Sequence, residues 1–445
     1  MENREIEDSN KLKHPTIKQY KSTARQAYFN FIKSNLGIGV IVLPVVTYQV
    51  GLLWSIFLFV PIAFSCVKSS QFMIEIADDL NTDNILYSDI IKQTLGILWA
   101  HILDIAIILQ LIGLCIAYLI FLTESLAQSL LQIDIQMTKL QCLLITLIIV
   151  IPLSFVRKIH FFHSTSKYGF YSALASFCII LYDCQNRLSI IDNFHFSNLM
   201  NFKNTFNYVG VAILCCEGIF TVLPIRDSMK NKFEFKSVAA QSLMTAFGIS
   251  IFLSLISSST YQQDTQSIVL FSIQNPILEV VSLILYSISL LLTFPLQLFP
   301  AVQIVESMFQ KNIFQYTSFH DIEENSNDDS PILKNADSIC NKIENITCEK
   351  DDEVFEDRFF QIIIRSTLMI TIYFIAYCVP HLSHFLNLIG SIFGSLLQFC
   401  FPVLVHMIYF KNSKSIRLVI QYAIILIVSI LAIVLGTAES LKHLL

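Results

Sequence analysis

Two long apolar stretches of the chain are interrupted near their middles by residues that an α-helix resists. The first reads Asn35-Leu36-Gly37-Ile38-Gly39 with Pro44 beyond it, and the second reads Cys216-Glu217-Gly218-Ile219 with Pro224 beyond it. In lipid every backbone N–H and C=O group needs a protein partner, so a continuous helix gains nothing from glycines or a carboxylate at bilayer depth. Unwound backbone in corresponding halves of a polytopic protein is typical of a secondary transporter's binding site.

The composition predicts a membrane protein. Only 14% of the 445 residues are charged, whereas soluble domains average about 25%. Apolar stretches of about 20 residues are long enough to cross the hydrocarbon core of a bilayer. We therefore expect an all-α polytopic membrane protein of eleven transmembrane helices, at 27–49, 51–77, 97–124, 139–156, 166–187, 205–226, 236–259, 275–306, 358–379, 382–410 and 415–438.

Ten of these spans divide into two sets of five within a transporter domain at 26–440. Repeat one covers 27–187 and repeat two covers 205–410, and each begins with an interrupted span. Because five is odd, the second set must insert upside down, which is the pattern of an inverted repeat. The spacing therefore predicts a five-plus-five fold in which helices 1 and 6 are discontinuous, with 415–438 as an extra helix.

Charge patterning predicts the topology. Basic residues gather before the first span and in alternate loops, so the positive-inside rule places the N-terminus in the cytosol, with 1–25 as a disordered tail. The segment 310–357 carries thirteen Asp and Glu against four Lys, which predicts a disordered cytosolic insertion between helices 8 and 9. Within it, Asp328-Asp329-Ser330-Pro331-Ile332-Leu333 looks like an acidic dileucine signal for a sorting adaptor.

The sequence offers little support for an enzyme or a resident cofactor. No phosphate-binding loop, zinc-ligand spacing or nucleophile elbow appears, so we expect neither catalytic nor metal-binding residues, and no nucleic-acid partner. The eleven cysteines fall mostly inside spans. Cys142 and Cys184, near outer helix ends, either pair with each other or serve as small buried residues.

The interruptions supply the candidate substrate site. Glycine permits unwound dihedrals and close approach of a ligand, and freed N–H groups at a helix start suit a carboxylate. Taken alone, Gly37 and Gly39 favour a close helix contact over a binding site, but Pro44 and the second interruption together favour the binding site. We expect the substrate to be bound by Asn35, Gly37, Ile38, Gly39, Tyr118, Cys216, Glu217 and Gly218.

The deep polar side chains allow two kinds of coupling. Glu217 lies near the middle of its span and must be paired or protonated for part of the time, which fits either proton coupling or a static brace of the unwound backbone. Lys68 either reaches the inner interface or pairs with Glu217. Ser289 and Thr293 either hydrogen-bond between helices or help to hold Na⁺.

Several segments together resemble one known family. Ile32 to Gly39 with Leu43-Pro44 resembles the first helix of the amino acid/auxin permeases, nearest to the proton-coupled and vacuolar branches. Further likenesses, in the family's order, are to its third, sixth, eighth and tenth helices: Gln110 to Phe121, Glu217 to Asn231, Leu285 to Gln297 and Asn387 to Pro402.

The resemblance implies a LeuT-like five-plus-five fold, amino acids as substrates and H⁺ as the usual driving ion. Two positions depart from the pattern. Phe220 stands where the family commonly has a second glycine, and Tyr48 and Gln49 occupy the stretch where proton-coupled mammalian members carry a histidine. The phenylalanine at position 220 is expected to narrow the site or to shift its specificity.

The sequence thus predicts a secondary transporter of small neutral amino acids in a plasma or vacuolar/lysosomal membrane. The coupling ion is either H⁺ or Na⁺. The alternative from another class is a nutrient sensor that binds an amino acid and signals through the tail and the acidic loop 310–357.

Overall fold

The computed structural model describes the chain at 22–80, 85–154, 159–188, 199–202, 204–216, 218–324, 362–379, 382–411 and 415–444. Across these ranges the backbone is almost entirely helical, and the β pairing found there is a single parallel bridge between Ser22 and Met229. Glu217 and the segment 328–333 lie outside the described residues.

The first repeat begins with a helix broken into α1 (Ala24–Asn35) and α2 (Gly39–Val50), whose axes differ by 54°. The helices that follow are α3 (Leu52–Leu80), a short α4 (Tyr87–Leu95), α5 (Ile97–Leu131), α6 (Lys139–Ser154) and α7 (Ile159–Leu188). Thr23 caps α1 in a capping box with Gln26, which fixes where the first helix starts.

The second repeat likewise begins with a broken helix, since α8 ends at Cys215 and α9 starts at Ile219. The helices of this repeat are α8 (Thr205–Cys215), α9 (Ile219–Ser228), α10 (Phe235–Tyr261), α11 (Pro276–Glu324) and a helix at Ile362–Cys378. The chain then continues as α13 (Leu382–Ile389), two π-helical turns at Gly390–Gly394 and Leu396–Cys400, and α14 (Phe401–Tyr409). The last span comprises α15 (Ile416–Leu431), the π turn Ala432–Gly436 and α16 (Thr437–Leu444).

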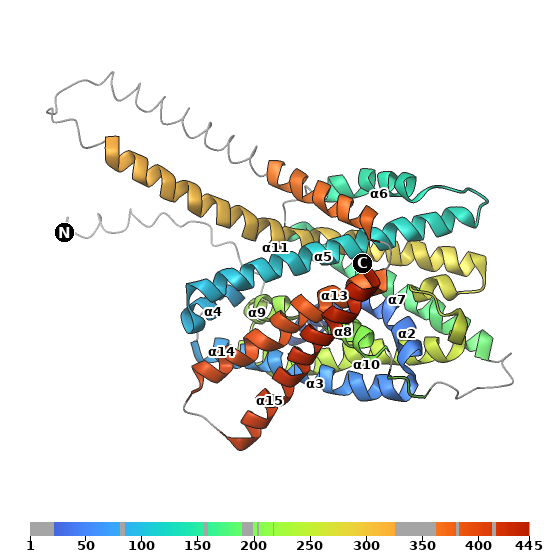
Figure 1. Ribbon diagram of the computed structural model, residues 1–445, viewed down its shortest axis with the longest axis horizontal. Coiled ribbons are helices and arrows are strands. Elements are labelled where there is room, and N and C mark those ends of the chain that lie inside the picture. Colours follow the sequence, from blue (N-terminus) through green and yellow to red (C-terminus); the bar gives the residue numbers. More distant parts are fainter. Residues whose placement is uncertain are drawn as a thin grey trace, which may run out of the picture.

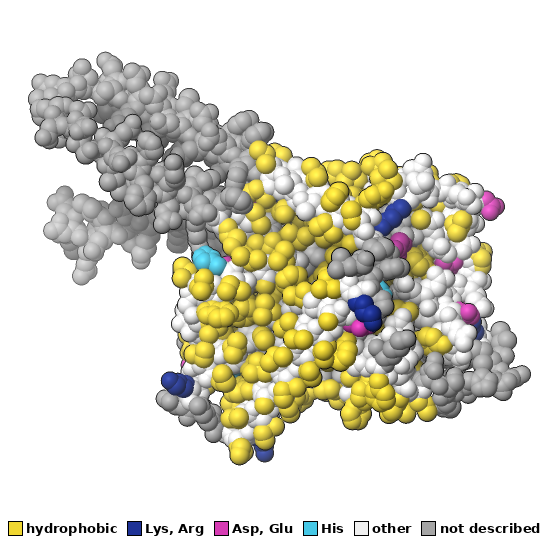
Figure 2. Space-filling model, in the orientation of Figure 1, with side chains coloured by type: hydrophobic (Ala, Val, Ile, Leu, Met, Phe, Trp, Pro, Cys, Tyr) yellow, Lys and Arg dark blue, Asp and Glu magenta, His cyan; other side chains and the backbone are white. Residues whose placement is uncertain are grey.

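Seven helical stretches of the described chain are long and apolar enough to cross a membrane, eight with the bent pair α1 and α2, and two shorter apolar helices accompany them. The helix α7 occupies the remaining expected span, 166–187, but is not among these stretches. The number eleven therefore stays a prediction. Hydrophobic side chains cover much of the face shown in Figure 2, and several, such as Phe57 and Ile148, are more than 70% exposed, as expected of a surface that contacts lipid.

The interrupted helices lie inside the bundle. Nine of the twelve residues of α2 and eight of the eleven of α8 are buried. The helices α5, α7 and α11 pack closely around them. Small serine side chains let α7 and α11 approach each other, since Ser172 and Ser176 of α7 donate to the Leu285 and Ser282 carbonyls of α11.

The helix α11 continues through Glu324 and extends past the bundle (Figure 1), so it enters the segment 310–357 for which composition predicts disorder. A helix that is already nucleated adds one hydrogen bond per residue, so it propagates beyond the span more easily than a new helix starts. The rest of that segment lies outside the described residues.

Candidate functional site

The two helix breaks contact each other at the centre of the bundle. A Cβ atom placed on Gly39 would lie 2.7 Å from Cys215 Sγ, and one placed on Gly218 would lie 2.4 Å from Asn35 Oδ1. Both distances are too short for a real side chain, so α2 and α9 approach the opposite break only because these residues are glycines. Two of the predicted glycines are therefore required by the contact between the breaks.

Gly37 lies in a different environment. A Cβ atom placed there would meet only Tyr118 Oη, at 3.8 Å, which is an ordinary contact distance. The structure therefore leaves room beside the backbone of the first break, and Tyr118 of α5 borders that room.

A tyrosine that the sequence analysis did not assign to the site holds the first break in place. Tyr286 of α11 is fully buried and donates a hydrogen bond of 3.0 Å from its hydroxyl to the Gly37 carbonyl. Its ring packs at 5.4 Å against Phe121 and at 5.8 Å against Phe177, measured between ring centroids. The signal in the sequence was weak, because a tyrosine in an apolar span is usually a packing residue.

Asn35, at the end of α1, presents an unused acceptor. Its amide nitrogen donates to the Phe31 carbonyl at 2.8 Å, whereas its Oδ1 atom is buried with no hydrogen-bond partner among the described residues. Buried polar atoms are almost always paired. An acceptor left over at a helix C-terminus, where the helix dipole is negative, suits an ammonium group.

Two carbonyls of the second break already accept hydrogen bonds. The Cys66 thiol donates to the Cys216 carbonyl at 2.7 Å, and the Thr221 hydroxyl donates to the Gly218 carbonyl at 2.9 Å. Thr221 also contacts Ser34 Oγ at 3.0 Å, which ties α9 to α1. Cys66 and Thr221 were not expected at the site from the sequence.

The predicted ion-binding hydroxyls lie elsewhere on α11. Thr293 donates to the Ser289 carbonyl one turn back at 2.8 Å, which is a common arrangement within a helix. A Cβ atom on Gly169 would lie 3.5 Å from the same Ser289 carbonyl and 3.8 Å from Lys33 Nζ. The ammonium of Lys33 and the carbonyl of Ser289 therefore both border Gly169, which the sequence analysis did not anticipate.

Further observations concern Lys68, two cysteines and the acidic and metal-ligating side chains. Lys68 donates to Gln71 of its own helix at 3.0 Å, and its predicted pairing with Glu217 falls outside the described residues. Cys142 and Cys184 are free and buried, so they do not pair and the small-residue interpretation holds. No group of three or more His, Cys, Asp or Glu in the described ranges could hold a metal ion.

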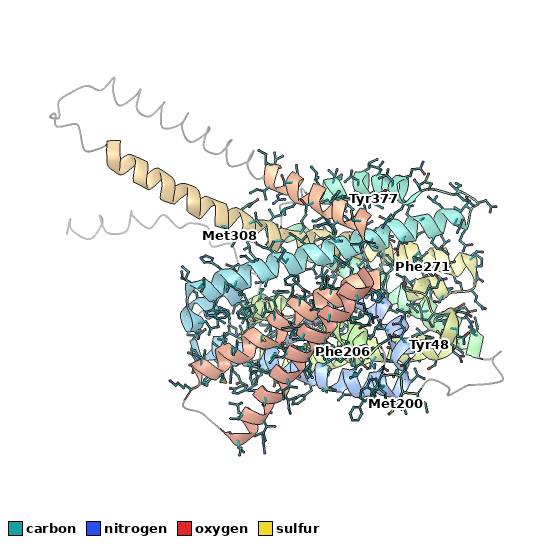
Figure 3. The ribbon with its side chains drawn as sticks, viewed as in Figure 1. Tyr48, Met200, Phe206, Phe271, Met308 and Tyr377 are labelled. Atoms are coloured by element: carbon teal, nitrogen blue, oxygen red, sulfur yellow. The ribbon has the colours of Figure 1, made fainter. Side chains whose placement is uncertain are left out.

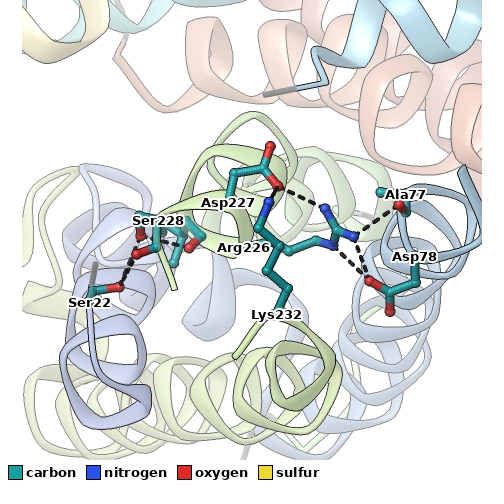
Figure 4. A network of polar contacts seen from close by, with 8 residues as sticks. Ser22, Ala77, Asp78, Arg226, Asp227, Ser228 and Lys232 are labelled. Atoms are coloured by element: carbon teal, nitrogen blue, oxygen red, sulfur yellow. Dashed lines mark hydrogen bonds and ion pairs between the residues drawn. The ribbon is translucent and has the colours of Figure 1, made fainter. Parts of the chain in front are cut away.

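At the end of the bundle that carries Ser22, here called the Ser22 face, ion pairs join the helices (Figure 4). The fully buried guanidinium of Arg226 pairs at 2.8 Å with Asp78 of α3 and with Asp227, and donates to the Ala77 carbonyl. Lys232 reaches Asp227 at 3.2 Å, and Ser22 pairs with the backbone of Ser228.

At the opposite end, here called the Val50 face, neutral contacts join the end of the first broken helix and the start of α3 to the segment before α8. Leu53 N and Trp54 N both contact the Leu199 carbonyl, and Asn201 N donates to the Val50 carbonyl at 2.8 Å. The Trp54 indole donates to Thr205 Oγ1 at 3.0 Å. Tyr48, Met200 and Phe271 lie toward this end of the bundle in Figure 3, whereas Met308 lies toward the other.

Similar proteins share both the sequence pattern and the fold. Residues 20–442 match the family described as transmembrane amino acid transporter protein. The chain is 24% identical to vacuolar amino acid transporter 4 of Saccharomyces cerevisiae over 88% of its own length and 53% of that protein's, so it spans about half of that relative. It is 22% identical to amino acid transporter AVT3B of Arabidopsis thaliana over 94% of its own length and 92% of that protein's.

Among solved structures, the fold is similar to that of Mhp1, a nucleobase-cation-symport-1 family transporter, with a TM-score of 0.55 at 12% identity over 96% of this chain and 94% of that one. The manganese transporter of Eremococcus coleocola gives the same TM-score at 10% identity, over 94% and 92% of the two chains. The predicted LeuT-like fold class is confirmed, and these relatives and neighbours are transporters. With the family pattern matched from residue 20 to residue 442, this chain belongs to the transmembrane amino acid transporter protein family.

Proposed function

We propose that this chain is a secondary active transporter that carries small neutral amino acids across a membrane by alternating access, driven by protons. The observation that carries the proposal is the room beside Gly37, between two helix ends of opposite polarity. Family membership and the transporter fold support the class of activity. The names of the relatives, among them a vacuolar transporter, support amino acids as the substrate and a vacuolar-type membrane as the location.

The geometry fits a zwitterion. The start of α2 at Gly39 carries the partial positive charge of a helix N-terminus, which suits the substrate carboxylate. Of the N–H groups there, that of Val40 already donates to the Gly37 carbonyl at 3.1 Å. The unused Oδ1 atom of Asn35, at the end of α1 and beside Gly218 of the second break, suits the ammonium group. Tyr118 and Tyr286 border Gly37 on the α5 and α11 sides.

Protons fit the surroundings of Ser289 better than Na⁺. The Lys33 ammonium borders Gly169, as the Ser289 carbonyl does, and its charge opposes a second cation in that neighbourhood. The Ser289 carbonyl also accepts from Thr293. Glu217 remains our candidate for the coupling carboxylate on the sequence argument alone. We expect Glu217→Gln to abolish accumulation driven by a pH gradient while exchange at equal pH is impaired less.

The test is uptake of a labelled amino-acid panel into proteoliposomes that contain the purified chain, under a pH gradient and separately under a Na⁺ gradient. Accumulation driven by pH is expected, and Gly37→Val should abolish it because the valine side chain fills the space beside Tyr118. Gly248→Ala is the matched control, since a Cβ atom there meets nothing within 4 Å. Folded Gly37→Val protein that still transports would contradict the site. Absence of flux together with amino-acid-dependent thermal stabilisation would favour the sensor.

A further inference from the structure

A histidine that the transport site does not use is buried near the Ser22 face. His406 of α14 is 3% exposed, and its ring stacks on Phe72 with 4.4 Å between centroids. Its Nε2 atom lies 2.9 Å from Glu75 Oε2 of α3, and its Nδ1 atom lies 2.6 Å from the Tyr422 hydroxyl of α15. Both ring nitrogens therefore have a hydrogen-bonding partner from another helix.

This arrangement can bind or release a proton without rearranging. In the neutral ring Nε2–H donates to Glu75 while Nδ1 accepts from the Tyr422 hydroxyl. In the charged ring both N–H groups donate, because a tyrosine hydroxyl both donates and accepts. Proton binding forms an N–H bond at Nδ1. Release to Glu75 breaks the N–H bond at Nε2 and forms an O–H bond on the carboxylate, which then gives the proton to water, and the neutral ring that remains donates its Nδ1–H to the Tyr422 hydroxyl. Histidine is the side chain whose ordinary titration falls between pH 5 and 8.

Other charged groups near the cluster are neutralised or point away. Lys236 of α10 contacts Glu75 Oε1 at 2.8 Å, and Tyr409 donates to Asp79 at 2.7 Å. The helix α4 packs against α14. On α4, the Asp89 carboxylate accepts from the backbone N–H of Leu86, the Tyr87 hydroxyl donates to the Leu397 carbonyl, and the Lys92 side chain is exposed. Asp78 is paired with Arg226. Glu75 is about one third exposed, so it offers a route to water.

Buried polar groups of α3 lie along the helix between this cluster and the second helix break. Ser65, Ser69 and Ser70 lie within about one turn of Cys66, whose thiol donates to the Cys216 carbonyl. The three hydroxyls are at most 1% exposed and have no hydrogen-bond partner in the part of the chain that the structure describes. Such groups are normally satisfied by ordered water.

The helix that carries His406 contributes to the same set of buried polar groups. Gln398, in the π-helical turn Leu396–Cys400 two turns before His406, donates to Cys66 Sγ at 3.1 Å, and its Oε1 atom also has no partner among the described residues. Because α3 and the Gln398–His406 segment contact each other at Cys66, Phe72 and Glu75 in turn, the two run side by side from the break to the Ser22 face.

We propose that the transported proton passes between the second break and the Ser22 face along this side of α3, and that Glu75, His406 and Tyr422 form its terminal binding site. The inference rests on the proton coupling proposed above. Water held by the serine hydroxyls and Gln398 carries the proton past Cys66, and His406 exchanges it with solvent through Glu75.

The experiment compares pH-driven accumulation with equal-pH exchange of the best panel amino acid in proteoliposomes containing the full chain. His406→Gln should lower pH-driven accumulation at least about tenfold, the scale of losing one proton-transfer group, and leave exchange within about twofold. Tyr422→Phe keeps the ring packing and removes only the hydroxyl, so it should lower pH-driven accumulation by an intermediate factor. This second variant still tests the proposal if His406→Gln does not fold. His101→Gln, at an exposed histidine of α5, is the matched control.

Each outcome decides between the proposals. If His406→Gln and Tyr422→Phe accumulate amino acid as the unmodified chain does, the pathway is wrong and the proposed function stands. If accumulation and exchange fall by the same factor in both variants, the cluster is only a brace. If the unmodified chain shows no pH-driven accumulation although it exchanges amino acid, proton coupling and this pathway fail together.

Discussion

The two ends of the bundle hold the same pair of broken helices by different chemistry. At the Ser22 face, buried Arg226 is paired with two aspartates that come from α3 and α9. At the Val50 face, backbone hydrogen bonds from 50–54 to 199–201 and the indole of Trp54 make the connection. Desolvated charges are costly to separate from their partners, whereas neutral hydrogen bonds exchange with water at small net cost. We infer that opening the Ser22 face costs more free energy than opening the Val50 face.

The largest effect is expected from removing the buried cation. Arg226→Met leaves Asp78 and Asp227 without their main partner, and breaking a buried pair in this way costs about 3–5 kcal/mol. We expect a strongly lowered melting temperature of the detergent-solubilised protein, read by fluorescence-detected size exclusion. Arg226→Lys, which keeps the charge but loses the forked geometry, should recover part of the loss. A melting temperature equal to that of the unmodified chain would show that the ion pairs do not hold this end.

A smaller effect is expected from the corresponding change at the Val50 face. Trp54→Phe keeps an aromatic ring against Phe202 but removes the hydrogen bond to Thr205, which is worth about 1 kcal/mol. Thermal unfolding in low and high salt measures it, and the loss should be the same in both, because no charge is involved. A loss that depends strongly on salt would remove the distinction between the two ends.

The smallest effect is expected from the exposed ion pair on the Val50 side. Arg187 contacts Asp264, whose side chain is 68% exposed. Solvent and salt screen such pairs, so Asp264→Asn should change the free energy of unfolding by well under about 1 kcal/mol. Measuring the free energies of unfolding of Asp264→Asn and Arg226→Met side by side tests whether an ion pair contributes to stability only where it is buried. Comparable destabilisation by the two substitutions would refute that view.

Most of the fold could be predicted from the sequence, and less of the site. The helix breaks at 35–39 and 215–219 lie where glycine and asparagine interrupt apolar stretches, and every predicted span contains a helix. The prediction for Gly37, Gly39 and Gly218 treated them alike. In the structure, however, Gly39 and Gly218 lie in the close contact between the breaks, where a side chain would clash, and of the three only Gly37 borders open space. Which role a glycine takes depends on its neighbours from the other repeat.

The same limit explains His406, which sequence analysis would treat as a polar residue tolerated near a helix end. Its partner Glu75 lies 331 positions away in the chain. No local pattern indicates which of the deep polar residues will meet.

The sequence by itself determined where the helices run and where they break. In a bilayer each backbone N–H and C=O group must be hydrogen-bonded within its own helix, and glycine permits the non-helical dihedral angles at which a helix ends. Tertiary structure alone decided that Tyr286 would bind the Gly37 carbonyl, that Asn35 would keep a buried acceptor unused and that Glu75 would meet His406. Those contacts join segments that are distant in sequence, and side-chain geometry selects them only once the two repeats have packed together.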